Sequence, residues 1–178
     1  MMGSEEHRSV GASPRVLLTG MMGTGKTTVG RALAAITGWP FLDNDELVER
    51  ATGQPTPDVL ARTDEATMRR AEIAALDDVL AAVPPLVAGV AAGVVLDPEA
   101  RKRMSAGAFV VYLRTPLTVL AERVGDGAGR PWLDGEPLLA LQRLYAGREP
   151  LYLEVADLVL DVEGVPPEDL AAAILGAL

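Results

Sequence analysis

One glycine-rich run constrains the fold of this chain more than any other feature. Residues 20–27 read GMMGTGKT and match the pattern G-x-x-x-x-G-K-[ST]. The run follows the apolar stretch Val16–Leu18 and leads into a helix-compatible stretch. In that context the loop turns backbone N–H groups and the positive end of a helix towards phosphate oxygens. We therefore predict a nucleoside triphosphate site, and the context disfavours the alternative of a glycine-rich turn without a ligand.

The same run predicts which side chains bind the nucleotide. Lys26 is expected to reach the β- and γ-phosphates, and the Thr27 hydroxyl is expected to ligate Mg²⁺. The predicted nucleotide-binding residues of the loop are Gly23, Thr24, Gly25, Lys26, Thr27 and Thr28.

Length and composition narrow the classes of protein. A chain of 178 residues suits one domain, which we place at residues 14–178 after a disordered leader at residues 1–13. A net charge of −9 argues against a nucleic-acid partner. The absence of cysteine excludes disulfides and thiolate zinc sites. No apolar run is long enough to span a membrane, so we expect a cytoplasmic protein without a membrane partner. We also expect a monomer.

Strand and helix patterns alternate along the chain. Apolar runs predict strands at residues 16–18, 40–43, 86–90, 109–113 and 158–161. Helical patterns fall at residues 26–37, 45–52, 57–62, 64–82, 98–106, 115–124, 138–152 and 167–178, with Asp64 as an N-cap. This order predicts a three-layer α/β fold of the P-loop NTPase class, with a five-stranded parallel sheet covered by helices on both faces. We expect the arrangement of nucleoside monophosphate kinases, with a lid near residues 124–136.

Two carboxylates follow the second predicted strand, where open α/β sheets place their ligands. Asp43 and Asp45 are separated by one residue. One of them can support Mg²⁺ while the other accepts the proton of an attacking hydroxyl. Asp43 or Asn44 could equally be an ordinary cap of the next helix. The spacing alone leaves both interpretations open.

Four arginines are candidates for anion binding: Arg69, Arg123, Arg130 and Arg148. Arg130 follows the glycine-rich residues 125–129, as an arginine on a closing lid would. Each could instead be a surface arginine, since Glu72 lies near Arg69 in sequence, and Glu149 and Glu154 lie near Arg148.

Taken in order, these segments resemble the shikimate kinase family over nearly the whole chain. The phosphate loop and residues 41–53, FLDNDELVERATG, are similar to the family's first two motifs. Residues 130–133, RPWL, resemble its lid. Residues 148–157, REPLYLEVAD, resemble its Arg-x-Pro-Leu-Tyr signature.

The resemblance implies an ATP-dependent kinase of aromatic amino acid biosynthesis, with the helices of residues 45–82 binding the substrate. Thr27 and Asp43 would hold Mg²⁺, and Arg123 would lie over the adenine. Lys26 and Arg130 would stabilise the transferred phosphoryl group. Asp45, as the catalytic base, would bind the acceptor together with Arg69 and Arg148, and Ala92 and Gly93 would lie beside it.

The sequence departs from the family at one element. The family carries three consecutive glycines after its third strand, whereas this chain has Ala91-Ala92-Gly93. The two methyl groups would narrow the acceptor site, or a glycine-only backbone would have to change. If the alanines limit the pocket, replacing both with glycine should improve shikimate turnover. Shikimate is thus the first candidate acceptor, a different hydroxy acid or cyclitol such as gluconate is a second, and a catalytically silent nucleotide-binding module is a third reading.

Overall fold

Five parallel strands form one sheet in the order β2-β3-β1-β4-β5. The computed structural model describes residues 14–54, 56–124 and 137–178, so the expected leader and Arg130 in the expected lid lie outside the described residues. The strands are β1 (Arg15–Thr19), β2 (Phe41–Asp43), β3 (Leu86–Gly89), β4 (Phe109–Arg114) and β5 (Leu158–Asp161). This confirms the predicted fold class. The central strand β1 lies between β3 and β4, with β2 and β3 on one side of it and β4 and β5 on the other. The phosphate loop, which follows β1, therefore lies where the strand order reverses.

The helices occupy the predicted segments. They are α1 (Lys26–Thr37), α2 (Asn44–Thr52), α3 (Thr56–Arg62), α4 (Glu65–Ala81), α5 (Pro98–Gly107), α6 (Leu117–Val124), α7 (Pro137–Val155) and α8 (Pro167–Ala177). The predicted N-cap of α4 is confirmed, because the Asp64 carboxylate accepts a hydrogen bond of 2.7 Å from the Thr67 N–H. Helix α7 runs three residues beyond the predicted end at Tyr152.

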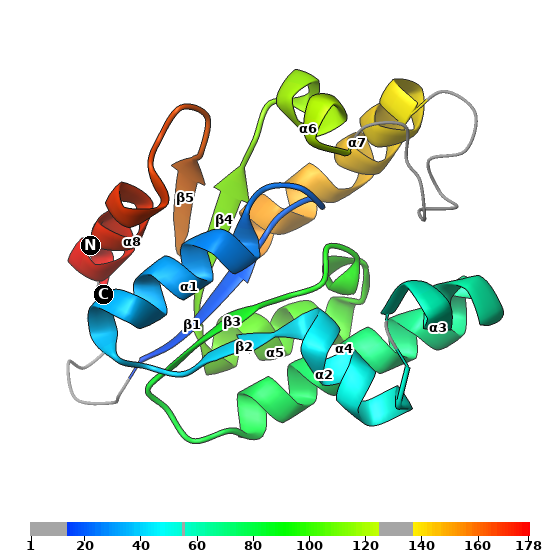
Figure 1. The fold of residues 1–178 in the computed structure, drawn as a ribbon, viewed down its shortest axis with the longest axis horizontal. Helices are drawn as coiled ribbons and strands as arrows, with labels where there is room; N and C mark the ends of the chain where they lie inside the picture. The colour runs from blue at the N-terminus through cyan, green and yellow to red at the C-terminus, as the bar shows by residue number, and fades with distance from the viewer. Residues whose placement is uncertain (1–13, 55, 125–136) are drawn as a thin grey trace, which may run out of the picture.

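Successive side chains of β1 point to opposite faces of the sheet, so the core has two layers. Val16 and Leu18 face α1 and α8, whereas Leu17 faces the other side of the sheet, where α4, α5 and α7 pack. Figure 1 shows α1 and α8 together on one face of the sheet. Alternation of inward side chains with period two produces this division.

Helices α2, α3 and α4 form a lobe with its own apolar cluster. Val48, Val59, Met68 and Ala75 make up this cluster, which is separate from the two cores beside the sheet. In Figure 1 the lobe lies on one side of the turn between β1 and α1, and α6 and α7 lie on the other. The turn that carries the phosphate loop therefore lies between two groups of helices.

One short element was not predicted. A three-residue helical turn, η1 (Val94–Leu96), follows the third strand and is closed by a hydrogen bond of 3.0 Å from Leu96 N–H to Gly93 O. A single turn of this kind has too few residues to show a periodic pattern. Within the described part of the chain, no helix is long and apolar enough to cross a membrane.

Candidate active site

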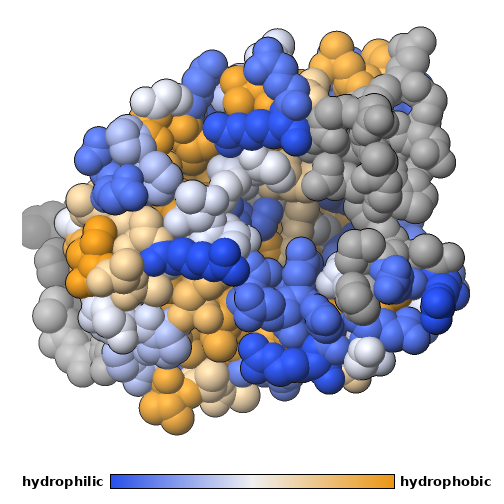
Figure 2. All heavy atoms as spheres, in the orientation of Figure 1, coloured by the Kyte–Doolittle hydropathy of each residue, from blue (hydrophilic) through white to orange (hydrophobic). Residues whose placement is uncertain are grey.

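A pocket of about 1020 Å³ opens at the carboxyl ends of β1, β2 and β3. Its walls come from the phosphate loop, the start of α2, one face of α4, residues 89–93, and the helices α6 and α7. Figure 2 shows the hollow on this face, with hydrophilic side chains gathered beside it. The space suits a nucleotide with a small acceptor beside it.

The phosphate loop has the backbone that its glycines were expected to permit. Gly20 and Gly25 have φ angles of 141° and 93°, which L side chains rarely adopt. A Cβ added at Gly20 would also lie 2.6 Å from the Leu113 carbonyl oxygen of β4. The two motif glycines are therefore required by the loop conformation and by its contact with the neighbouring strand.

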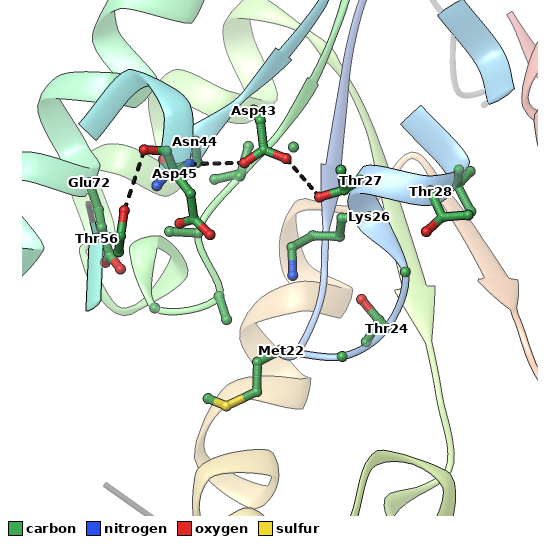
Figure 3. A pocket seen from close by; sticks show the side chains of 18 of the residues that line it. Met22, Thr24, Lys26, Thr27, Thr28, Asp43, Asn44, Asp45, Thr56 and Glu72 are labelled. Carbon is green, nitrogen blue, oxygen red and sulfur yellow. Dashed lines mark hydrogen bonds between the residues drawn. The ribbon is translucent and has the colours of Figure 1, made fainter. Parts of the chain in front are cut away.

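Lys26 lies at the base of the pocket. Its Nζ donates hydrogen bonds to the carbonyl oxygens of Gly20 at 3.0 Å and Met21 at 2.9 Å. Burial lowers the Lys26 pKa to about 8, and the nearby carboxylates of Asp45 and Asp43 oppose that shift. Figure 3 shows the side chains of Lys26 and Asp45 directed into the same space. The ammonium and the predicted base therefore face a common volume from opposite walls.

Asp43 divides its two carboxylate oxygens between two partners, as the dashed lines in Figure 3 show. Oδ2 accepts a hydrogen bond of 2.7 Å from the Thr27 hydroxyl, and Oδ1 accepts one of 3.0 Å from the Asp45 N–H. Asp43 is the N-cap of α2 by the second bond. The cap interpretation of Asp43 is therefore confirmed, and the metal-side role stays a prediction, with Oδ2 placed at the phosphate loop.

The side-chain oxygens of Thr27 and Asp43 are suitable ligands for a hard cation. The Thr27 hydroxyl and the Asp43 carboxylate both supply oxygen, which Mg²⁺ prefers. The described residues contain no group of three histidine, cysteine, aspartate or glutamate side chains that could enclose a metal. Mg²⁺ commonly binds through one or two protein oxygens, with phosphate and water completing its shell. The residues present therefore fit that ion with a bound triphosphate.

Arg69 lies on the pocket face of α4. Its side chain is 19% exposed and forms ion pairs with Glu72 and, at 3.9 Å, with Glu65. Burial raises the Glu72 pKa, and the positive charges of Arg69 and Arg148 oppose that shift. The pairing of Arg69 with Glu72 was the alternative to an anion-binding role, yet both residues line the pocket. Arg69 is thus held at the pocket wall by the half-buried Glu72.

Arg148 enters the pocket from α7 and is only 7% exposed. The two acids near it in sequence have other partners. Glu149 accepts from the Tyr145 hydroxyl at 2.5 Å, and Glu154 accepts from Arg101 at 2.9 Å. The surface-pairing alternative for Arg148 is therefore wrong for these two acids. A buried guanidinium directed at a pocket suits binding of a carboxylate or phosphate.

The loop that departs from the family pattern keeps an ordinary backbone. No described residue other than glycine has a positive φ, so Ala91 and Ala92 need no glycine-only conformation. Gly93 differs, because an added Cβ would lie 1.8 Å from Nη1 of Arg69. Of the three positions, Gly93 is therefore the one where a side chain would displace the Arg69 guanidinium.

The wall of the pocket near the phosphate loop includes one predicted residue, Arg123, and several residues that were not predicted. Arg123 of α6 donates a hydrogen bond of 3.1 Å from Nη1 to the Gly23 carbonyl oxygen, which places it over the phosphate loop. Val162 and Val165, between β5 and α8, and Pro167, the first residue of α8, also line the pocket. Their apolar character carries no chemical signal in the sequence, so they were missed. Glu72 was missed as a site residue, although its spacing of three from Arg69 could have indicated it.

Comparison with known proteins identifies the family. The family model described as "Shikimate kinase" matches residues 22–178. The chain belongs to the shikimate kinase family. A shikimate kinase of Aromatoleum aromaticum is 43% identical over 82% of this chain and 83% of that protein. The shikimate kinase of Halorhodospira halophila is 39% identical over 92% of this chain and 93% of that protein.

Comparison with solved structures supports the same family. A shikimate kinase from Acinetobacter baumannii, solved in complex with shikimate, superposes with a TM-score of 0.86 and 35% identity, covering 92% of this chain and 91% of that one. Like its shikimate kinase relatives, this chain is therefore an ATP-dependent kinase that acts on a small molecule.

Proposed function

We propose that this protein transfers the γ-phosphoryl group of ATP to a hydroxyl of shikimate, which gives shikimate 3-phosphate and ADP. The observation that carries the proposal is the convergence of Lys26, Asp45, Arg69 and Arg148 on one pocket beside the phosphate loop. Two arginines suit the acceptor carboxylate, and one aspartate suits its hydroxyls. Relatives of 39% and 43% identity that are named shikimate kinases favour shikimate over gluconate or another cyclitol.

In the proposed reaction, the acceptor hydroxyl attacks the γ-phosphorus in line with the bond to the β-phosphate oxygen. The hydroxyl proton passes to the Asp45 carboxylate, a new O–P bond forms, and the bond to the leaving ADP oxygen breaks. Lys26 stabilises the charge on the phosphoryl oxygens from the base of the pocket. Arg130 is proposed to do so from the lid.

Two oxygen-bearing side chains are proposed to hold magnesium. Thr27 would ligate Mg²⁺ directly, and Asp43 would bind it through water or directly. When bound, the ion supplies neutralisation of charge on the β- and γ-phosphates. The contact of 2.7 Å between Thr27 and Asp43 supports this pairing. Arg123 and the apolar residues Val162, Val165 and Pro167 are proposed to receive the adenine.

We propose that the protein is a cytoplasmic monomer that works without a nucleic-acid partner. The net charge of −9 supports the last point, since a negative surface repels phosphodiester backbones.

A coupled assay of ADP release tests the proposal. We expect turnover with shikimate, and mass spectrometry should detect a product heavier by one phosphoryl group. Quinate, gluconate and simple cyclitols should give much lower kcat/KM values. Asp45→Asn keeps the size of the side chain and removes the base, so it should lose turnover. ATP binding without transfer to any of these acceptors would instead favour a silent nucleotide-binding module, and faster turnover of gluconate would reassign the acceptor.

A further inference from the structure

Tyr152 is a fully buried residue of α7 whose hydroxyl contacts the loop after β3, and that loop lines the pocket. The hydroxyl donates a hydrogen bond of 2.6 Å to the carbonyl oxygen of Ala92, which lies sixty residues away in sequence. It also lies 3.7 Å from Sδ of Met21 in the phosphate loop. Sulfur is a weak acceptor, so the Ala92 carbonyl is the principal partner.

The ring of Tyr152 packs in the apolar core, whereas its hydroxyl contacts the loop at Ala92. The ring stacks on Tyr112 of β4, with centroids 5.0 Å apart and an angle of 25° between the planes. That contact belongs to the apolar core and would be kept by phenylalanine. Burial raises the Tyr152 pKa, so the hydroxyl keeps its proton and remains a donor. The hydroxyl therefore matters for the loop at Ala92 rather than for the core.

The hydrogen bond between Tyr152 and Ala92 connects the helix that carries Arg148 to the loop against which Arg69 packs. Arg148 lies four residues before Tyr152 on the same helix, so the two side chains are on one face of α7. Ala92 shares a planar peptide with Gly93, and the Arg69 guanidinium packs against Gly93. A continuous path therefore runs from Arg148 through α7 and the Tyr152 hydroxyl to the Ala92–Gly93 peptide and Arg69.

We propose that Tyr152 is a positioning residue for the acceptor, and that its hydroxyl sets the relative placement of Arg69 and Arg148 through the Ala92–Gly93 peptide. The proposal rests on the proposed function, in which the two arginines bind the acceptor carboxylate. It also accounts for a loop that tolerates alanine at position 92. The Tyr152 hydroxyl acts on a backbone carbonyl, which alanine and glycine share.

Tyr152→Phe tests this role, because it removes one oxygen and keeps the ring. We expect the KM for shikimate to rise about tenfold, because the half-buried Ala92 carbonyl loses its donor and the loop shifts. The KM for ATP should change less than twofold. A role in stability alone would lower the melting temperature and leave the two KM values in their original ratio, which would overturn the proposal.

Tyr145→Phe is the matched control on the same helix. It also removes one hydroxyl hydrogen bond, the one of 2.5 Å to Glu149, but Glu149 does not line the pocket, whereas Ala92, the partner of Tyr152, does. We expect both KM values of this variant to stay within twofold of the unmodified protein. An equal rise of the shikimate KM in both variants would overturn the proposal, since loss of any hydroxyl from α7 would then suffice.

Two further variants keep the test available if Tyr152→Phe does not fold. Tyr152→4-aminophenylalanine retains a donor at the same place, and Tyr152→4-fluorophenylalanine fills the same volume without one. The amino variant should keep a shikimate KM close to that of the unmodified protein, and the fluoro variant should not. Equal values would overturn the proposal. If the unmodified protein fails to phosphorylate shikimate, the proposed function fails first, and that result is distinct from equal KM values among active variants.

Discussion

The Thr27 hydroxyl donates to Oδ2 of Asp43 at 2.7 Å, which links the end of the phosphate loop to the end of the second strand. The other oxygen of Asp43 caps α2, the helix that carries Asp45. The nucleotide side and the acceptor side of the pocket therefore meet at a single carboxylate. A side chain at this place can bind a cation with one oxygen while the other oxygen holds the start of the helix that carries Asp45, the proposed base.

The Thr27 hydroxyl can be removed with little change in shape. We expect Thr27→Val to lower kcat about 100-fold and to raise the Mg²⁺ concentration needed for half-maximal rate, because the variant lacks the ligand oxygen. Thr27→Ser keeps the hydroxyl and should retain most activity. A magnesium titration at fixed ATP measures both. A valine variant with the magnesium dependence of the unmodified protein would show that Thr27 is not a ligand.

The lowered Lys26 pKa predicts a particular pH profile. A lysine with a pKa of about 8 loses its charge in the free enzyme as the pH rises through that value. We therefore expect kcat/KM for ATP to fall above about pH 8. A bound triphosphate favours the charged form and raises the pKa, so kcat at saturating ATP should hold to higher pH.

Initial rates between pH 6 and pH 10 test this profile, with Lys26→Arg as the comparison. Arginine stays charged over the whole range, so whatever activity remains should lack the break near pH 8. A break that persists in the arginine variant would belong to another group.

Arg148 can be compared with an arginine on the same helix. We expect Arg148→Ala to raise the shikimate KM about 100-fold and to change the ATP KM only a little, because the variant loses the buried guanidinium that is proposed to bind the acceptor carboxylate. Arg143 of α7 is exposed and does not line the pocket, so Arg143→Ala controls for the loss of one charge. Similar increases in the two KM values of Arg148→Ala would contradict its assignment to the acceptor.

The loop at residues 91–93 predicts opposite outcomes for neighbouring substitutions. Gly93→Ala places a methyl group on the Arg69 guanidinium, and we expect the shikimate KM to rise at least tenfold while the fold remains. Replacing Ala91 and Ala92 with glycine relieves no backbone strain, since neither has a positive φ. That double variant should gain no activity and should lose about 1 kcal/mol of stability, because glycine has more freedom in the unfolded chain. Circular dichroism melts and acceptor titrations measure both, and faster turnover in the double variant would show that the methyl groups obstruct the acceptor.

Local signals in the sequence predicted the elements and the sheet. The G-x-x-x-x-G-K-[ST] run predicted β1, the loop and α1, and the start and end of α1 at Lys26 and Thr37 agree with the structure. The predicted strand at residues 158–161 also agrees at both ends. Such segments are predictable because their pattern and their end signals lie within a few residues.

The contacts that assemble the site were not predictable in the same way. The bond between Tyr152 and Ala92 joins positions sixty residues apart, and neither residue signals the other. The partner of Glu154 is Arg101 rather than the nearby Arg148, because α5 brings Arg101 beside it. The even choice between a cap and a metal-side role for Asp43 also had no answer in the spacing. Only the fold reveals that each oxygen of Asp43 has its own partner.

The separate apolar cluster of Val48, Val59, Met68 and Ala75 bears on how such a protein can change over generations. The helices that carry Asp45 and Arg69 pack around that cluster, whereas the phosphate loop is anchored on the cores beside the sheet. Substitutions among these four side chains can therefore reshape the acceptor wall while the triphosphate cradle stays intact. In proteins with this architecture, single substitutions in the cluster can therefore change the acceptor specificity while nucleotide binding is kept.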